Sequence, residues 1–114
     1  MITLYGISGC DTVRRARGWL DERGIGYRFH DLRKHGIDPL LVGRWMAELG
    51  WENLLNRRGL VWRRLPEEVR AGIDEAAAER LILADPAIIK RPLLAMDGTH
   101  VVGFSEQRYG ELFP

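Results

Sequence analysis

The stretch that decides the fold is ITLYGISGCDTVRRARGWL, residues 2–20. Its first residues, 2–5, predict a short strand that stops at a glycine, and residues 7–10 predict a turn. A helix is expected over about residues 11–23, because apolar side chains recur there at helical spacing. The turn places Cys10, the only cysteine of the chain, between a strand and the first residue of a helix.

Two further segments extend this start. Alternating aromatic and polar residues predict a second strand over residues 27–32. Strand, helix and strand within about 30 residues is the size of one βαβ unit, which joins two parallel strands. Residues 38–86 read as helical, with Asp38 and Asp74 as helix starts and an apolar stripe of Ala77, Leu81 and Ala84 on the last helix.

The last quarter of the chain changes character. Residues 93–96 are a continuous apolar run, and Asp97-Gly98 after them is typical of a type I′ hairpin turn. Apolar residues over 101–104 supply a returning strand, and Ser105 can cap a final helix. The order predicts a single α/β domain over residues 1–114. It has the connectivity of a thioredoxin-like fold (β-α-β, then β-hairpin and α) with an inserted helical subdomain.

Length and composition fit a small globular domain. The 114 residues are 46% hydrophobic and 29% charged, with a formal net charge of +1. So small a net charge gives no general attraction to nucleic acid, and no nucleic-acid partner is expected. The sequence has no apolar run of about 20 residues and no signal-peptide pattern, so we expect a cytoplasmic protein without a membrane partner.

Cys10 is the strongest candidate for chemistry. Backbone N–H groups and the helix dipole favour an anion at a helix N-terminus, and the thiolate is the nucleophilic form of cysteine. Arg14 lies four residues on, and helical side chains lean toward the N-terminus, so its guanidinium could reach back toward the sulfur. The alternative is that Cys10 is a small hydrophobe chosen for packing.

The cysteine has no partner in the chain. Val13 stands where a C-x-x-C motif would have its second cysteine. A monothiol cannot resolve its own mixed disulfide, so a redox cycle needs an outside thiol such as glutathione. The three histidines show no metal-ligand spacing, so neither a metal site nor a tightly bound cofactor is expected.

Several stretches together resemble the ArsC-like (arsenate reductase/Spx) family of thioredoxin-fold proteins. The resemblance runs nearly end to end, and it is closest to the YffB-type glutathione-dependent thiol reductases. The matching residues are Leu4-Tyr5-Gly6, GCDTVRRARGWL (9–20), YRFHDLR (27–33), ELGWENLLNRRGLVWRRL (48–65), AIIKRPLL (87–94) and VGFSEQRY (102–109).

The resemblance implies a set of site residues. Cys10 would be the site thiol, Arg58 and Arg91 would face it, and the Arg91-Pro92 bond would be cis. With Arg14, these residues would bind glutathione, the expected co-substrate, or an oxyanion. From the residues alone, Arg58 lies in a basic run that reads as a solvated face or an anion clamp, and Pro92 as the start of an edge strand.

The resemblance favours a glutathione-dependent monothiol oxidoreductase acting on a disulfide or mixed disulfide. Two alternative functions remain: an arsenate reductase, and a non-enzymatic regulator similar to Spx. Arsenate reductases of the family carry a further arginine in the last strand, where this chain has Val102-Gly103-Phe104. Spx-like regulators, which bind RNA polymerase without turnover, usually carry the C-x-x-C motif that Val13 interrupts.

Overall fold

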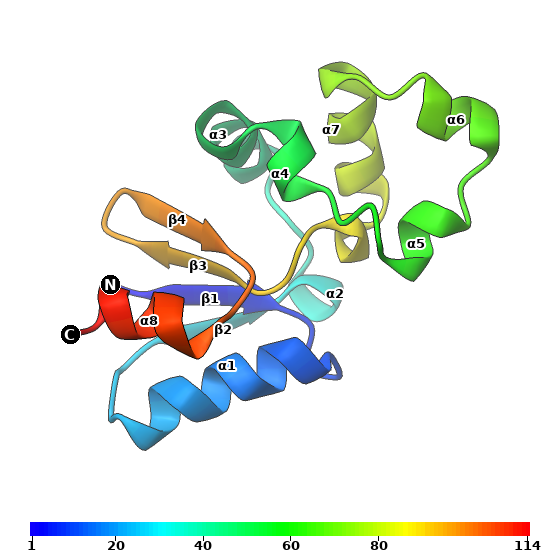
Figure 1. Cartoon of the computed structure of the whole chain (residues 1–114). Coiled ribbons are helices and arrows are strands. Elements are labelled where there is room, and N and C mark those ends of the chain that lie inside the picture. The colour runs from blue at the N-terminus through cyan, green and yellow to red at the C-terminus, as the bar shows by residue number, and fades with distance from the viewer. The chain divides into compact units, whose positions relative to one another are not determined.

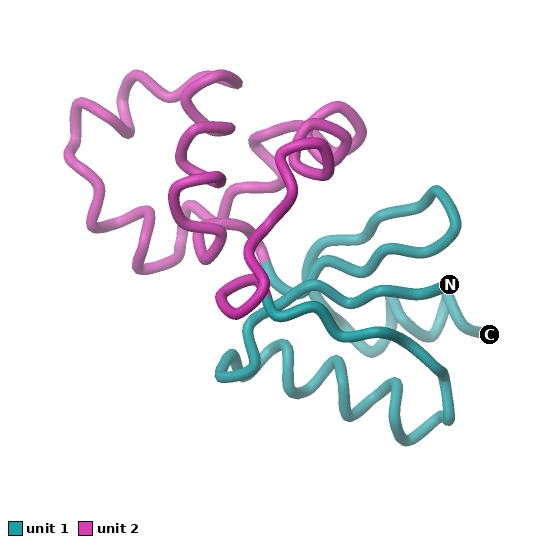
Figure 2. The backbone as a smooth tube through the Cα atoms, turned by 180° about the vertical axis from the view of Figure 1, so that it is seen from behind, with its two compact units in different colours: residues 1–31, 91–114 teal, residues 32–90 magenta.

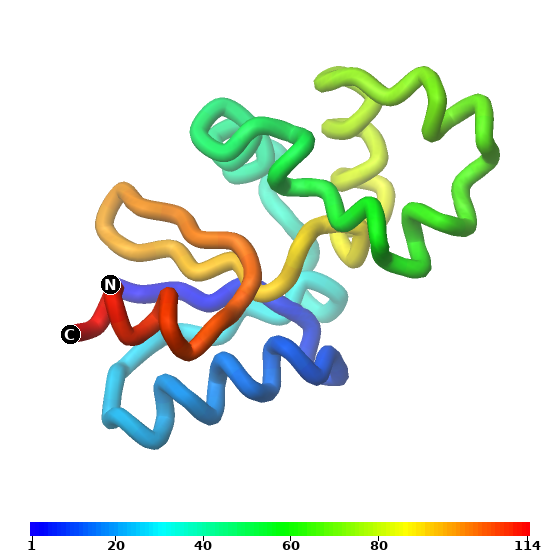
Figure 3. Tube along the Cα trace, viewed as in Figure 1, coloured from blue at the N-terminus to red at the C-terminus, as the bar shows by residue number.

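The computed structural model describes every residue from Met1 to Pro114 and divides into two compact units (Figure 2). The α/β unit consists of residues 1–31 and 91–114, and the helical unit consists of residues 32–90. The helical unit therefore interrupts the α/β unit, and both ends of the chain lie in the α/β unit (Figure 3).

The α/β unit is built on a four-stranded sheet with the strand order β2-β1-β3-β4 (Figure 1). Strand β1 pairs in parallel with β2 and antiparallel with β3, and β3 pairs antiparallel with β4. The elements of the unit are β1 (Thr3–Gly6), α1 (Asp11–Glu22), β2 (Arg28–Asp31), β3 (Leu93–Met96), β4 (Thr99–Val102) and α8 (Glu106–Leu112). This order confirms the thioredoxin-like arrangement.

The core of the α/β unit lies on the face of the sheet that α1 and α8 cover. Leu4 on β1 stands opposite Phe29 on β2 and Leu94 on β3, and Leu94 stands opposite Val101 on β4. Residues opposite one another share a face of the sheet, so they form one apolar row. The helices add Ala16, Trp19, Leu20 and Tyr109 to this core.

Two turns depend on glycines with positive φ, and the second differs in type from the turn that the sequence predicts. Gly24 follows α1 with φ of 65°, the left-handed conformation common after a helix. Asp97 and Gly98 join β3 to β4 as expected, but only Gly98 has a positive φ, 81°. A type I′ turn needs positive φ at both central residues, so the turn is of another type.

The helical unit consists of short elements. They are α2 (Leu32–His35), α3 (Pro39–Leu49), α4 (Trp51–Leu54), α5 (Leu60–Arg63), α6 (Glu67–Ala71), α7 (Glu75–Ala84) and a 3₁₀ turn at Pro86–Ile88. The carboxylate of Asp38 accepts a hydrogen bond from the amide of Leu40, and that of Asp74 accepts one from Ala77. Both expected helix starts are thus confirmed as caps.

Two expectations about this unit need adjustment. The unit begins at residue 32, because α2 follows β2 directly, and it ends at residue 90. The expected stripe on α7 is only partly right: Ala78 and Ile82 are buried, Ala77 and Leu81 are half-buried, and Ala84 is exposed. None of the helices in the chain is long and apolar enough to span a membrane.

Candidate active site

Cys10 occupies the N-cap position of the 12-residue helix α1, with φ of −80° and ψ of 128°. Its amide donates to the carbonyl of Ile7 at 3.0 Å, which closes the expected turn, and its carbonyl accepts from the amide of Arg14 at 3.0 Å. The thiol is free, and the residue is partly exposed. The cysteine therefore stands at the positive end of a helix dipole, within reach of a dissolved reagent.

The loop that carries Cys10 leaves β1 at one end of the sheet. Gly6, the last residue of β1, stands opposite Asp31, the last residue of β2. On the other side, Tyr5 stands opposite Leu93, so the register continued by one residue sets Pro92 next to Gly6. The Arg91-Pro92 peptide is cis, as expected. The Cys10 loop, Asp31 and Pro92 thus lie at the same end of the sheet.

A close approach fixes where α1 starts. A Cβ atom built on Gly6 would lie 2.8 Å and 3.0 Å from the two γ-carbons of Val13. Carbon atoms in contact normally keep about 3.5–4.0 Å apart, so only glycine allows β1 and α1 to meet this closely. Cys10 sits on the short segment between these two residues, and the contact therefore restricts its position.

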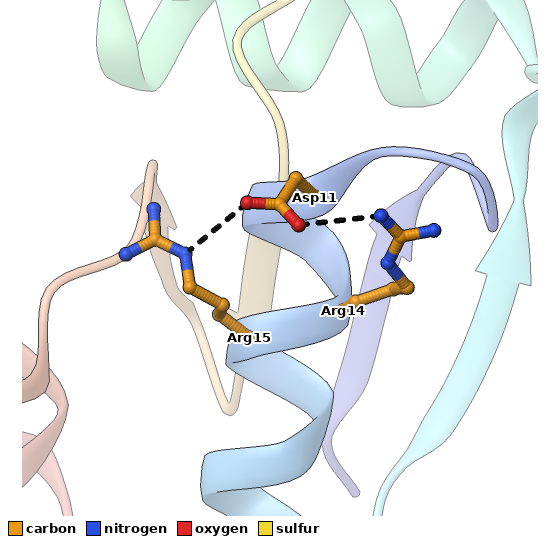
Figure 4. A network of polar contacts seen from close by, with 3 residues as sticks. All are labelled: Asp11, Arg14 and Arg15. Atoms are coloured by element: carbon orange, nitrogen blue, oxygen red, sulfur yellow. Dashed lines mark hydrogen bonds and ion pairs between the residues drawn. The ribbon is translucent and has the colours of Figure 1, made fainter.

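Arg14 leans toward the N-terminus of α1, where it meets a partner that the sequence analysis did not identify. Its guanidinium donates to the carboxylate of Asp11 at 3.2 Å, and Nε of Arg15 lies 3.9 Å from the other oxygen of Asp11 (Figure 4). All three side chains are largely exposed. Two arginines and one carboxylate thus surround the first turn of the helix, with a net positive charge.

Arg91 is half-buried beside Pro92. Its Nε is buried and has no hydrogen-bond partner. A charged donor that lacks a partner in a partly dry environment favours an anionic acceptor, which would relieve the cost of its desolvation. This property suits the anion-binding role expected for Arg91.

Arg58 lies in the helical unit, where it is exposed. Its amide donates to Oδ1 of Asn56 at 3.2 Å, which shapes the turn before α5. Arg58 lines a pocket of about 390 Å³ together with Glu52, Leu55, Asn56, Arg57 and Lys90. Three cations and one carboxylate around a pocket of this size suit a small anion.

The expected site residues are thus divided between the units. Cys10, Arg14, Arg91 and Pro92 belong to the α/β unit, and Arg58 belongs to the helical unit. Sequence reasoning missed Asp11, although an acidic residue in the first turn of a helix with arginines three and four positions on is a readable ion-pair signal. It also missed Lys90, which no local pattern connects to Arg58. No group of three or more histidine, cysteine or acidic side chains is placed to hold a metal ion.

Known proteins resemble the chain along almost its whole length. In structure it is similar to the YFFB protein, with 47% identity, a TM-score of 0.92 and 97% of each chain covered. It is also similar to an arsenate reductase (ArsC) related protein from Brucella melitensis, with 46% identity and a TM-score of 0.82. That match covers 98% of this chain and 93% of the other.

Two curated relatives extend the comparison. An uncharacterized protein of Haemophilus influenzae is 38% identical over 99% of both chains. The global transcriptional regulator Spx of Enterococcus faecalis is 27% identical over the whole of this chain and 87% of its own length. Residues 5–112 match the ArsC family, and this match includes every residue of the candidate site. The chain therefore belongs to the ArsC family.

Proposed function

We propose that this protein is a glutathione-dependent monothiol reductase of disulfides or mixed disulfides. The observation that carries the proposal is the position of its only cysteine, partly exposed at the N-cap of α1, in a chain of the ArsC family. A thiolate is stabilised at such a position, and the thiolate is the attacking species. Glutathione is the abundant thiol of the reducing cytoplasm, where we place the protein.

The reaction has two steps. The Cys10 thiolate attacks the glutathione sulfur of a mixed disulfide between a substrate thiol and glutathione. The sulfur–sulfur bond breaks, the substrate leaves as its thiolate, and Cys10 is now linked to glutathione. The thiolate of a second glutathione attacks this link, releases the Cys10 thiolate and forms oxidised glutathione. In total one reduced glutathione is consumed: its sulfur is oxidised to the disulfide level while the substrate sulfur is reduced to the thiol, and no second cysteine is required.

The arginines would hold the carboxylates of glutathione. Arg91 offers a buried Nε without a partner, and Arg58 lines a pocket with two further cations. Arg14 would add positive charge beside Cys10, although its guanidinium also forms an ion pair with Asp11. Pro92 would shape the groove beside the sulfur. In this proposal binding is charge-assisted, and the sulfur chemistry belongs to Cys10 alone.

Mass spectrometry after exposure to oxidised glutathione tests the proposal directly. The wild-type protein should gain one glutathione per chain, and reduced glutathione should remove it. Cys10→Ser should gain none. If the wild type forms no adduct and shows no glutathione-induced shifts near Cys10 in NMR spectra, the reductase proposal fails.

The anion-binding role has its own experiment. Losing a charge-assisted hydrogen bond costs about 1.5–3 kcal/mol, so Arg91→Ala and Arg58→Ala should each weaken glutathione binding roughly ten- to a hundredfold. Arg63→Ala is the matched control, because Arg63 is also exposed in the helical unit but does not line the pocket. NMR titration measures all three. Equal affinities in the three variants would remove both arginines from the site.

A regulatory role is the second candidate, supported by the similarity to Spx along the whole chain. In that case the protein would bind RNA polymerase and carry out no turnover. Pull-down of purified RNA polymerase by the wild-type protein and by Cys10→Ser separates the regulatory function from the reductase function. Polymerase binding together with failure to form the glutathione adduct favours the regulator, and an adduct without polymerase binding favours the reductase.

A further inference from the structure

Asp31 is the only charged side chain that the fold buries. It is 5% exposed, and every other buried side chain in the protein is hydrophobic. Removing a carboxylate from water is costly unless hydrogen bonds replace those it gave up, so a buried aspartate has partners that the fold needs. The partners of Asp31 therefore indicate what the residue does.

The position of Asp31 points to the Cys10 loop. Asp31 ends β2, opposite Gly6, which ends the parallel strand β1. Side chains alternate along a strand, so Asp31 lies on the same face as Phe29, the face that α1 covers. The chain leaves β1 at this end and passes through residues 7–10 to the start of α1. Asp31 is thus placed under the loop that ends at Cys10.

A hydrogen bond connects the two. The amide of Ser8 donates to Oδ2 of Asp31 at 3.3 Å. Within the loop, the amide of Cys10 donates to the carbonyl of Ile7 at 3.0 Å. The first bond ties the loop to β2, and the second closes the turn. Both polar anchors act on the backbone immediately before the thiol.

Little else holds the tip of this loop. Ser8 and Gly9 are both exposed, and a Cβ atom built on Gly9 would meet no atom within 4 Å. Side-chain packing therefore does not fix the two residues that precede Cys10. The hydrogen bond from Ser8 to Asp31 supplies a constraint that packing does not.

We propose that Asp31 is a positioning residue for Cys10. Its carboxylate accepts the Ser8 amide and thereby keeps the loop in the conformation that sets Cys10 at the N-cap of α1, turned toward an incoming disulfide. The kinetic consequence rests on the proposed reductase function, whereas the structural consequence does not. The proposal requires an acceptor oxygen at residue 31 and not a negative charge.

Two variants of similar size separate these requirements. Asp31→Asn keeps an acceptor oxygen and removes the charge, whereas Asp31→Leu has the same branched shape and removes the acceptor as well. Replacing a buried charge by an apolar group of similar volume is often tolerated, so Asp31→Leu is expected to fold. If it does not, Asp31→Ala takes its place. Val101→Ala is the control, because it disturbs the core of the same unit from β4, away from the loop.

Amide hydrogen exchange tests the structural part without reference to any reaction. The Ser8 and Cys10 amides should exchange about tenfold faster in Asp31→Leu, which corresponds to the loss of one hydrogen bond, and close to the wild-type rate in Asp31→Asn. Val101→Ala should leave unchanged the exchange rates of these two amides relative to those of the amides in α1. Unchanged exchange of Ser8 in Asp31→Leu overturns the proposal.

The rate of adduct formation with oxidised glutathione tests the kinetic part. Asp31→Leu should react about tenfold more slowly than the wild type, and Asp31→Asn within about threefold of it. Equal slowing in Asp31→Leu and Val101→Ala would mean a general loss of stability and overturn the positioning role. Equal slowing in both Asp31 variants would mean that the charge matters, which also overturns it. If the wild type itself does not react, the reductase function fails while the exchange result still decides the role of Asp31.

Discussion

Gly6 and Val13 approach each other so closely that no methyl group fits between β1 and α1. A Cβ atom on Gly6 would lie 2.8 Å from one γ-carbon of Val13 and 3.0 Å from the other. Both atoms belong to a short, stiff side chain that is fully buried, so they cannot swing aside. The contact joins the strand before Cys10 to the helix after it.

Gly6→Ala should therefore destabilise the protein by about 1–3 kcal/mol, the usual cost of overpacking a core. Val13→Ala in the same chain should recover part of that loss, since it removes the clashing carbons, with a coupling of about 1 kcal/mol or more. Urea unfolding measures the free energies. Gly18→Ala is the control, because a Cβ there meets open space and should stabilise the helix slightly. Strictly additive effects of the Gly6 and Val13 substitutions would contradict the contact.

Asp11→Asn should change reactivity and stability in opposite directions. Neutralising the carboxylate leaves the charges of Arg14 and Arg15 uncompensated beside Cys10, so reaction with anionic oxidised glutathione should quicken about two- to fivefold. The same change removes a favourable acidic residue from the first turn of α1, so the free energy of unfolding should fall.

Salt and a second aspartate provide the controls for Asp11. The gain in rate should vanish in about 1 M salt, where charges are screened beyond roughly 3 Å. Asp21→Asn, near the other end of the same helix, should leave the rate unchanged. A rate increase that persists in high salt would indicate a change in loop structure and not in charge.

Tyr109 should make stability depend on alkaline pH. Its ring is fully buried against Trp19 and Phe104, its hydroxyl has no partner, and burial raises the pKa of the phenol above its ordinary value. In the unfolded chain Tyr109 ionises near pH 10, whereas in the folded chain it stays neutral. Unfolding then releases a proton, so the free energy of unfolding falls as pH rises above about 10, by at most 1.4 kcal/mol per pH unit.

Tyr109→Phe isolates this effect. The variant should be more stable than the wild type by about 1 kcal/mol at neutral pH, because it removes a buried hydroxyl that makes no hydrogen bond. Above about pH 10 its advantage should widen, because it has no phenol to ionise. Thermal unfolding across this range gives both values. If the stability of the two proteins changed with pH in parallel, Tyr109 would have the same pKa in the folded and unfolded states, which would contradict the prediction.

Glu52 should oppose the binding of anions in the pocket that Arg58 lines. It is the one carboxylate among Arg57, Arg58 and Lys90, and it is exposed. If glutathione binds there, Glu52→Gln should tighten its binding by about two- to fivefold at low salt, since it removes a like-charge repulsion. Glu67→Gln, exposed in the same unit but outside the pocket, should have no effect. Calorimetric titration compares them, and tighter binding in both variants would indicate a general charge effect.

Local signals explain which parts of the fold could be predicted. Asp38 before Pro39, Asp74 and Ser105 are helix caps whose side chains bond to amides two or three residues on, so the sequence window contains all the information. The cysteine between a strand and a helix is equally local. The face of α7 was misjudged because Ala77 and Ala78 are adjacent and chemically identical. Packing against α3, which periodicity does not describe, decides between them.

The remaining features depend on residues far apart in the sequence. Asp31 is buried because the register of β1 and β2 brings it beside the Ser8 amide, 23 positions away. Lys90 joins Arg58 in one pocket through the fold of the helical unit. Hydrophobic period and turn chemistry carry no information about either pairing. Only the family resemblance gave reason to expect Arg58 and Arg91 to act together.

The insertion of the helical unit also sets an order of events during synthesis. Strand β1 lies at the centre of the sheet, yet its partner β3 is made about 90 residues later, since Tyr5 pairs with Leu93. At typical ribosomal speeds the helical unit takes roughly 3–12 s to emerge, and throughout that time one edge of β1 has no neighbour. The locally connected helices can fold early, whereas the sheet waits for its most distant contact. A nascent chain halted before residue 91 would leave one edge of this central strand without a partner, and chaperones and aggregating chains both bind such open edges.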